Sequence, residues 1–403
     1  AIPNDLIEAP QESLPVERPA FASDRASAAP SRAVSSAAAM LAAAERPAIL
    51  AGNGARISRA GEEILALAEH LAAPIGVTAM GRTVVEETHP LFAGVTGALN
   101  NGTGGFGSIA NTLLADADVL LVAGSSLDSA STNGQQFPHA GQKVIHIDVD
   151  ADEVGRIFPD ATPVPGDARA TLQALLGAVR ELASRKDSGP LREEIASRMA
   201  GVGADLETLT TRASKPVYPG RVYGALAEVM EPNSVFTADA SYSSIWSLST
   251  LQAGKHFSHL VYGRAAGTLG FGFPAALGAK LTHPDKTVIN VVGDGGFGYD
   301  WGELETAARE RINVVCIVLN NGALGYQTHF ARELGQARWL DFADVRHDRL
   351  AEACGLGGAL VEDPDDLVPT IRRAIDADRT WVIDVRCDLD AMPPMSGVDQ
   401  VGH

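Results

Sequence analysis

Asp294 and Asn321 are the residues whose types and positions in this sequence could do chemistry together. Each stands just beyond an apolar run, residues 287–292 and 313–319, and the residues between the two runs predict a helix. Because both strands of a parallel strand–helix–strand unit end on the same side of a sheet, we expect the two side chains to meet there. Carboxylate and amide oxygens are hard ligands that suit an Mg²⁺ ion shared with phosphate. The pattern therefore predicts a metal–diphosphate site with Asp294 and Asn321 as ligands.

Glycines surround Asp294 in the sequence. Gly293, Gly295 and Gly296 would let a ligand approach the backbone closely, and the helix start after them would offer N–H groups to an anion. An ordinary strand–helix–strand unit with glycine turns is the alternative interpretation. A second cluster upstream, residues 267–280, in which glycines alternate with apolar residues, favours the ligand site.

The composition narrows the possible functions. A chain of 403 residues is long enough for two or three domains. Its 32 basic and 50 acidic residues give a net charge of −18, which argues against a nucleic-acid-binding surface. The clusters around Asp294 and Asn321 contain no lysine or arginine. A diphosphate bound there would therefore need a divalent cation and backbone dipoles to neutralise it.

Cysteine usage and hydropathy indicate the compartment. Cys316, Cys354 and Cys387 are scattered and form no Cys-x-x-Cys pair, so we expect reduced core thiols rather than zinc or disulfides. The chain has no run of 18 apolar residues, and residues 1–30 lack a signal pattern. We expect a cytoplasmic protein.

Strands and helices are expected to alternate, which predicts an α/β fold with two doubly wound parallel-sheet domains. The first is a Rossmann-like domain at 31–185, with expected strands at 47–51, 74–78, 119–123 and 143–147 and helices at 35–44, 57–71, 107–115 and 168–185. The second, at 191–403, has expected strands at 234–237, 287–292, 313–319 and 381–385 and helices at 191–210, 221–230, 273–280, 302–309, 348–354 and 364–377. Residues 1–30, rich in Pro, Ala and Ser, are expected to be a linker from a preceding domain.

The glycine clusters and Asn320-Asn321 together resemble the thiamine-diphosphate signature of the acetolactate synthase and benzoylformate decarboxylase superfamily. The resemblance implies that the second domain binds thiamine diphosphate and Mg²⁺, with Asp294 and Asn321 binding the metal by side chain and Ala323 by its carbonyl. The other implied cofactor-binding residues are Gly295, Gly296, Phe297, Leu324, Gly325 and, in a loop that touches diphosphate, Tyr242 and Ser243.

Two residues of the upstream cluster take catalytic roles by the same resemblance. Leu269 matches the bulky apolar residue that forces the cofactor into a bent conformer, and the Gly267 carbonyl would face the aminopyrimidine. The bend makes proton removal from the thiazolium intramolecular, with a large effective concentration. The cofactor then serves as an electron sink for decarboxylation of a 2-oxo acid. A tightly packed glycine-rich helix start is the alternative for this cluster.

The segment after the asparagines should line the substrate pocket. Tyr326 and Phe330 stand where acetolactate synthases have Met and Trp, and Gln327 lies beside Tyr326. This departure leaves the second substrate open. His329 could be a proton shuttle, although a lone histidine on a helix is more often solvated or satisfied by a neighbour.

The resemblance covers the central and C-terminal domains of the superfamily and not its N-terminal pyrimidine-binding domain, which supplies a glutamate to the cofactor. We therefore expect a partner chain or a missing segment to bear that domain, in a homo- or hetero-oligomer. The leading reaction is an acetolactate-synthase-like carboligation or decarboxylation of a 2-oxo acid. A 2-hydroxyacyl-CoA lyase, a benzoylformate-type decarboxylase and a non-catalytic cofactor-binding regulatory subunit are the alternatives.

The first domain resembles the superfamily's central domain, which holds FAD, ADP or nothing. The turn at residues 51–56 has two of the three glycines of a dinucleotide fingerprint, and a plain tight turn is the alternative. The acetolactate synthase type has an arginine after a strand where this chain has residues 124–128, without arginine. It also has a stretch with Met and His before the preceding helix, where this chain has residues 98–103. Both departures count against FAD. Asp148–Asp152 resembles the start of a calcium-binding loop. The glycine and the terminal glutamate that such a loop needs are absent further along, so we do not expect calcium binding there.

Overall fold

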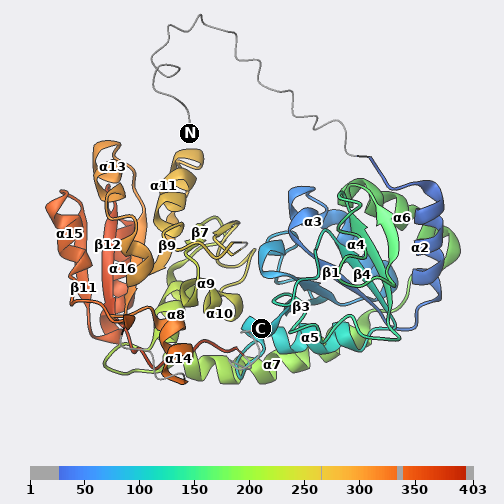
Figure 1. The fold of residues 1–403 in the computed structure, drawn as a ribbon, viewed down its shortest axis with the longest axis horizontal. Coiled ribbons are helices and arrows are strands. Elements are labelled where there is room, and N and C mark those ends of the chain that lie inside the picture. The colour runs from blue at the N-terminus through green and yellow to red at the C-terminus, as the bar shows by residue number, and fades with distance from the viewer. Residues whose placement is uncertain (1–26, 265, 334–338, 396–403) are drawn as a thin grey trace, which may run out of the picture.

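Two six-stranded sheets, one after the other along the chain, organise the protein. The computed structural model describes residues 27–264, 266–333 and 339–395. Neighbouring strands in both sheets pair in parallel. Helices cover both faces of each sheet, as Figure 1 shows. The prediction of an α/β fold with two doubly wound domains is confirmed.

The first sheet has the strand order β3-β2-β1-β4-β5-β6, so the order reverses between β1 and β4. Its strands are β1 (Pro47–Ala51), β2 (Ile75–Val77), β3 (Phe92–Val95), β4 (Val119–Ala123), β5 (Lys143–Asp148) and β6 (Thr162–Pro165). Its helices are α2 (Ser31–Ala43), α3 (Asn53–Ile57), α4 (Gly61–Leu71), α5 (Gly107–Ala115) and α6 (Ala168–Leu182).

Apolar residues on both faces of each inner strand explain why this sheet is covered on two sides. In β1, Ile49 packs into the core that contains α2, α4 and α6, whereas Leu50 packs into a separate cluster with Leu114 of α5. Successive side chains of a strand point to opposite faces, so one apolar strand joins two cores.

The second sheet has the order β11-β12-β10-β9-β7-β8, so its order reverses between β7 and β9. Its strands are β7 (Val235–Ala238), β8 (His259–Tyr262), β9 (Val288–Gly293), β10 (Val315–Asn320), β11 (Gly357–Val361) and β12 (Trp381–Arg386). Its helices are α8 (Pro219–Val229), α9 (Tyr242–Ile245), α10 (Ser247–Thr250), α11 (Gly272–Thr282), α12 (Asp294–Gly298), α13 (Glu303–Arg309), α14 (Gly325–Glu333), α15 (His347–Ala353) and α16 (Leu367–Ile375).

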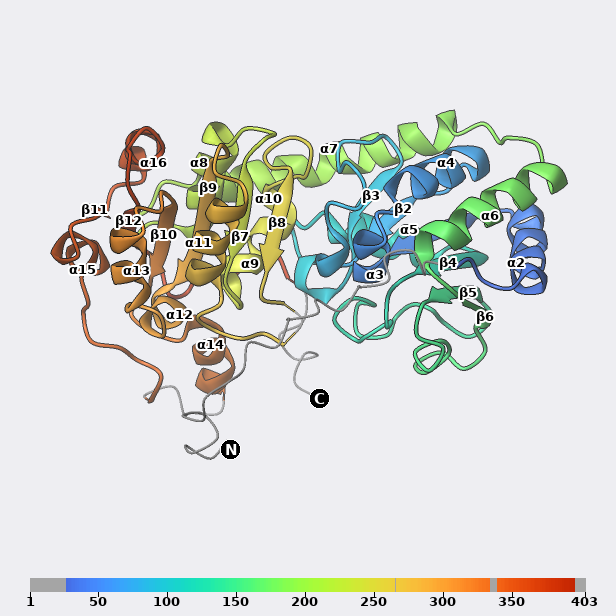
Figure 2. The ribbon, with the colours of Figure 1, turned by 90° about the horizontal axis from the view of Figure 1, so that it is seen from above.

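Helix α7 (Gly189–Thr211) connects the two sheet regions and runs along both of them, as Figure 2 shows. It packs on α8 and on α5. Its one fully buried residue is Ile195, which explains why its sequence has no strong apolar face.

Arg82 joins the two sheet regions from inside. Its guanidinium is fully buried and forms a two-point pair with Glu87, at 2.7 Å from Nε and 2.6 Å from Nη2. It also donates to the Ser247 carbonyl at 3.0 Å and to Tyr262 Oη at 3.1 Å, both beyond α7 in the chain. Burial alone would lower the pKa of Arg82, but Glu87 and Tyr262 raise it, so the group stays charged.

The eight predicted strands are present, and four further strands were missed. The missed strands are β3, β6, β8 and β11, and they are the four edge strands of the two sheets. The helix predicted at 57–71 corresponds to α4 and begins later than predicted, at Gly61, because Arg59 with a positive φ of 56° separates α4 from the short helix α3, which ends at Ile57. The predicted linker at 1–30 lies almost wholly outside the described residues.

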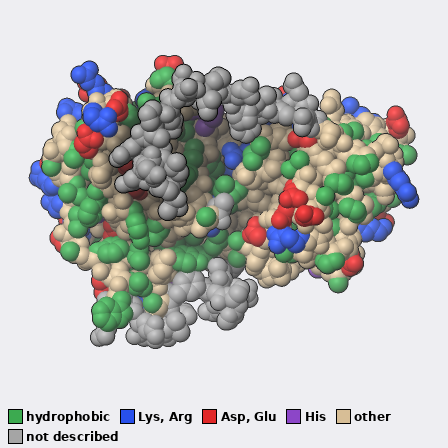
Figure 3. Space-filling model, turned by 45° about the horizontal axis from the view of Figure 1, so that its top comes forward, with side chains coloured by type: hydrophobic (Ala, Val, Ile, Leu, Met, Phe, Trp, Pro, Cys, Tyr) green, Lys and Arg blue, Asp and Glu red, His purple; other side chains and the backbone are tan. Residues whose placement is uncertain are grey.

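One face of the first domain carries a group of charged side chains. Acidic side chains gather visibly on the face of the first domain in Figure 3. Within the described parts of the chain, no helix combines the length and apolarity that crossing a bilayer requires.

Candidate functional site

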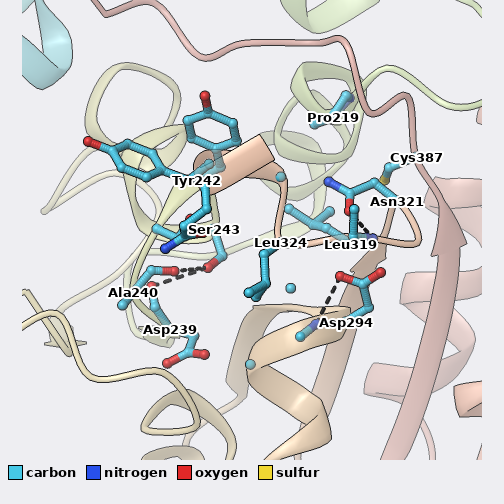
Figure 4. Close-up of a pocket in the computed structure, with 18 of the residues that line it drawn as sticks. Pro219, Asp239, Ala240, Tyr242, Ser243, Asp294, Leu319, Asn321, Leu324 and Cys387 are labelled. Atoms are coloured by element: carbon cyan, nitrogen blue, oxygen red, sulfur yellow. Dashed lines mark hydrogen bonds between the residues drawn. The ribbon is translucent and has the colours of Figure 1, made fainter. Parts of the chain in front are cut away.

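A pocket opens at the carboxyl edge of the second sheet, where the strand order reverses between β7 and β9. Open α/β sheets commonly bind ligands at such a position. The pocket is lined by twelve of the predicted site residues: Tyr242, Ser243, Leu269, Asp294, Gly295, Gly296, Asn321, Ala323, Leu324, Gly325, Tyr326 and Gln327. Figure 4 shows Tyr242 and Ser243 on one side, Asp294 and Asn321 on the other, and Leu324 between them.

Asp294 is the first residue of α12, directly after β9, and only 6% of its surface is exposed. Its Oδ1 accepts a hydrogen bond from Gly295 N at 2.9 Å. Its Oδ2 accepts one from Gly322 N at 2.7 Å, which ties it to the turn after β10. Burial raises the pKa of Asp294 to about 6, while these backbone bonds act to lower it.

Asn321 starts the turn that receives Asp294. Its Oδ1 accepts a hydrogen bond from Ala323 N at 3.1 Å, and Gly322 between them has a positive φ of 74°. Glycine adopts that conformation without a Cβ penalty, which explains its place in the turn. The two clusters, distant in the sequence, therefore lie side by side.

Asn320, the other asparagine of the pair, faces the interior. Its amide donates to Asp384 Oδ1 at 2.9 Å and to the Val345 carbonyl at 3.1 Å. Asp384 is fully buried, and its Oδ2 accepts from His347 N at 2.8 Å. Asp384 thus fixes the end of β10, a role that the sequence analysis missed.

Asp239 holds the loop that carries Leu269. It directly follows β7, is 1% exposed, and accepts hydrogen bonds from the backbone N–H groups of Gly270, Phe271 and Gly272 at 3.0, 3.1 and 3.3 Å. Burial raises the pKa of Asp239, and the three backbone donors oppose that rise. Asp239 lines the same pocket. Its position directly after an apolar strand was the sequence signal that could have identified it.

Three predicted site residues are placed differently. Gly267 is exposed with a φ of +65° and is absent from the pocket lining. Phe297 is fully buried in the core beside Phe273, so only its backbone is available to a ligand. The side chain of Phe330 lies outside the described part of the structure.

The charges of the lining are acidic. Asp239, Asp294 and Asp388 line the pocket, and no lysine or arginine does so among the described residues. Nor do three His, Cys, Asp or Glu side chains converge anywhere in the described ranges. A metal here would rest on one carboxylate together with amide and carbonyl oxygens.

A second cavity, of about 520 Å³, lies at the carboxyl edge of the first sheet and reaches Leu248 and Arg264 of the second region. Its lining is mostly Ser, Thr, Asn and small apolar residues, with Asp128 and Arg264 as the charged members. In the turn predicted as a possible dinucleotide loop, Gly52 N donates to the Ala123 carbonyl and Gly54 N to the Gly124 carbonyl, both at 2.9 Å.

Two family models match the chain. The central domain of thiamine pyrophosphate enzymes matches residues 34–175, and their C-terminal thiamine pyrophosphate (thiamine diphosphate) binding domain matches residues 239–385. Asp294, Asn321 and Leu269 all lie within the second match.

Curated relatives extend over nearly the whole chain. A probable acetolactate synthase large subunit of Methanocaldococcus jannaschii is 32% identical over 374 residues, 89% of this chain and 61% of the relative. The acetolactate synthase large subunit of Haemophilus influenzae is 30% identical over 361 residues, 86% of this chain and 59% of the relative. A probable 2-ketoarginine decarboxylase of Pseudomonas aeruginosa is 33% identical over 296 residues, 73% of this chain and 49% of the relative.

The chain thus spans about three fifths or less of the length of these relatives. Two consecutive domain matches, a sheet arrangement that agrees with them and identity across both domains lead to one conclusion. The chain belongs to the thiamine-diphosphate-dependent enzyme superfamily that includes the acetolactate synthases.

Proposed function

We propose that this chain is the cofactor-binding part of a thiamine-diphosphate- and Mg²⁺-dependent carboligase or decarboxylase that acts on 2-oxo acids, in the manner of an acetolactate synthase. The observation that carries the proposal is the hydrogen bond from Gly322 N to Asp294 Oδ2, because it joins the two motif clusters in one pocket.

The donor set fits a magnesium ion. Asp294 would supply a carboxylate oxygen, Asn321 an amide oxygen and Ala323 its carbonyl, which are hard ligands of the kind Mg²⁺ takes alongside phosphate oxygens. A buried carboxylate whose pKa is raised to about 6 gains from a cation that stabilises its charged form. No lysine or arginine is among the described lining residues, which supports a divalent cation and backbone N–H groups as the partners of the diphosphate charge.

The remaining lining residues suit the rest of the cofactor. Leu269 would press against its rings, and the backbone of Gly295 and Gly296 would donate to its diphosphate. When bound, thiamine diphosphate supplies the electron sink that decarboxylation of a 2-oxo acid needs. Leu269 is held in place by the loop that Asp239 anchors, so its position is defined before the cofactor binds.

The relatives support a 2-oxo acid substrate. Two are named as acetolactate synthases and one as a 2-ketoarginine decarboxylase, so both carboligation and decarboxylation occur among them. The shared requirement is loss of CO₂ from a 2-oxo acid, and that step is the core of the proposal.

A pyrimidine-binding domain would complete the site. No glutamate is found among the described residues that line the pocket. We propose that a second polypeptide segment, on another chain or in a longer form of this one, contributes it within a homo- or hetero-oligomer.

Calorimetry tests the binding part of this proposal. Thiamine diphosphate should bind the chain with Mg²⁺ and bind much more weakly with EDTA. Asp294→Asn should reduce the affinity by more than about 100-fold, since loss of even a metal's outer partners costs 10- to 100-fold. Asp148→Asn is the matched control, because Asp148 also ends a strand, β5, but at the other sheet. Equal binding with and without Mg²⁺ would contradict the proposal.

An assay tests the catalytic part. The chain mixed with a polypeptide that carries a pyrimidine-binding domain should release CO₂ from 2-oxo acids, and Asp294→Asn should not. Tight cofactor binding with no CO₂ release from any 2-oxo acid in that mixture would instead indicate a non-catalytic regulatory subunit.

A further inference from the structure

Tyr242 and His329 form a hydrogen-bonded pair beside the cofactor pocket. Tyr242 Oη lies 2.6 Å from His329 Nδ1, and the two rings are 5.5 Å apart. Tyr242 begins α9, whereas His329 lies on α14, so two separate elements build the pair. Tyr242 itself lines the pocket and is 9% exposed.

A backbone carbonyl sets the tautomer of His329. Its Nε2 lies 2.7 Å from the Leu389 carbonyl oxygen, which can only accept a hydrogen bond. The proton of the neutral ring therefore sits on Nε2, and Nδ1 must accept from the Tyr242 hydroxyl. When the ring is protonated, Nδ1 donates instead, and the hydroxyl proton of Tyr242 becomes free to point elsewhere.

The pair lies at the end of the pocket away from Asp294. Tyr242 lies across Leu324 from Asp294 in Figure 4. Tyr326 packs edge-on against Tyr242, with ring centroids 5.4 Å apart, and lines the pocket too. If the diphosphate lies at Asp294, the reacting end of the pocket is the end where these two tyrosines stand, and Tyr242 then serves that end instead of the diphosphate contact that the resemblance implies for its loop.

Among the described residues, an acidic and a basic side chain lie near His329. Asp390 follows Leu389 and interacts electrostatically with His329, and Arg332, one turn further along α14, is paired with Asp390. Burial, with a smaller contribution from Tyr326, raises the pKa of Tyr242, so the phenol stays protonated at neutral pH. A neutral phenol backed by an imidazole is a proton relay rather than a fixed charge.

We propose that Tyr242 and His329 deliver the proton that replaces CO₂ on a 2-oxo acid, an inference that rests on the proposed function. The bond to the carboxylate carbon breaks, CO₂ leaves, and the carbon that keeps the electron pair gains a proton from Tyr242 Oη. The Nδ1 proton of protonated His329 replaces it on Oη, and water returns one proton to His329. One 2-oxo acid and one proton give one aldehyde and CO₂. Tyr242 is the catalytic residue, and His329 is a positioning residue that acts through it.

The consequence is a preference between the two reactions of the superfamily. A proton donor at the reacting end favours release of an aldehyde over capture of a second carbonyl compound. We therefore expect aldehyde as the main product, with more carboligation when the relay is removed.

Nuclear magnetic resonance of the chain alone tests the pair without turnover. In ¹⁵N-histidine-labelled protein, the His329 signal, identified by its loss in His329→Gln, should show a proton on Nε2 and an accepting Nδ1. Tyr242→Phe should shift the Nδ1 signal. His70→Gln is the control, because His70 also bonds a backbone carbonyl, that of Ala183, but away from the pocket. A proton on Nδ1, or a signal indifferent to Tyr242→Phe, would overturn the pair.

Turnover of the complemented enzyme tests the relay. Tyr242→Phe and His329→Gln should each lower aldehyde formation by about 100-fold, the lower bound for general acid catalysis. His329→Gln should also remove one ionisation from the pH profile of kcat while leaving the affinity for thiamine diphosphate within about twofold, and His70→Gln should change neither. If the wild type fails to bind the cofactor, the proposed function fails. If it binds and turns over but the variants match it, the relay alone fails.

Discussion

The two sheets of this protein share a design and differ at the edge where ligands bind. Each has six parallel strands and one reversal of strand order, between β1 and β4 in the first and between β7 and β9 in the second. At the first reversal, backbone carbonyls of the neighbouring strand end take up the N–H groups of the turn. At the second, two buried carboxylates, Asp239 and Asp294, take up N–H groups from loops distant in the sequence.

The two sheets share a fold, so the chemistry that each edge can perform depends on the polar side chains placed there. The carboxylates of the second sheet each fix a loop and also line a pocket. In the first sheet, the N–H groups of the turn donate to backbone carbonyls at the end of the neighbouring strand. The cavity beside that turn is lined chiefly by neutral groups. The described residues therefore concentrate buried carboxylates at the pocket of one of two similar sheets.

The largest expected effect comes from breaking the contact that joins the two regions. Arg82→Met would leave Glu87 buried without its partner, which costs about 3–5 kcal/mol of unfolding free energy. We expect the wild type to unfold in one calorimetric transition and Arg82→Met to unfold at a lower temperature in two. Arg198→Ala, which removes an exposed pair with Glu194, is the control and should cost less than about 0.5 kcal/mol. One unchanged transition in Arg82→Met would contradict the role of Arg82.

Glycines at the two turns should respond differently to a methyl group. A Cβ on Gly52 would lie 2.2 Å from the Gly124 carbonyl oxygen, whereas a Cβ on Gly293 meets no atom within 4 Å. Gly52→Ala should therefore cost up to about 3 kcal/mol of stability by overpacking. Gly293→Ala should leave the stability almost unchanged and yet weaken thiamine diphosphate binding, because Gly293 lines the pocket.

Urea unfolding and calorimetry of the two variants measure both effects. The comparison between the turns would be wrong if Gly293→Ala unfolded the protein or if Gly52→Ala left its stability intact.

The smallest expected effect is a pH dependence at the junction. Burial, with Lys255 and Arg82, lowers the pKa of His256 to about 4, against about 6.5 in an unfolded chain. The unfolded state binds more protons between these values, so the contribution is full above pH 6.5 and is lost as the pH falls towards 4. The loss between pH 7 and pH 5 is about 2 kcal/mol. Urea titrations at the two pH values measure it, and His256→Gln should show a smaller difference by about that amount.

The inner strands could be predicted from sequence, and the edge strands could not. The predicted strands are rich in apolar residues, and the four missed ones, among them β6 with its two prolines and β11 with its two glycines, lie at edges. An edge strand packs against one neighbour, so its sequence carries less of the apolar signal.

The candidate site shows the same division. Asp294, Asn321 and Leu269 stand in glycine-rich clusters that a sequence reveals. Asp239 stands directly after an apolar strand, but its partners lie about 30 residues away in the chain, and the partner of Asp384 lies about 60 residues away, so no local pattern reveals which groups these carboxylates bind. His329 gave no signal beyond its type, because its bonds to Tyr242 and Leu389 exist only in the folded protein.

The central claim is that one cation is shared by the turns after β9 and β10. Crystals grown with thiamine diphosphate and Mn²⁺ in place of Mg²⁺ test it through the anomalous scattering of manganese. We predict one peak within about 2.2 Å of both an Asp294 carboxylate oxygen and the Asn321 amide oxygen, close to the distance that Mg²⁺ takes to oxygen. A manganese peak elsewhere, with thiamine diphosphate bound and these two oxygens free of any cation, would contradict the account.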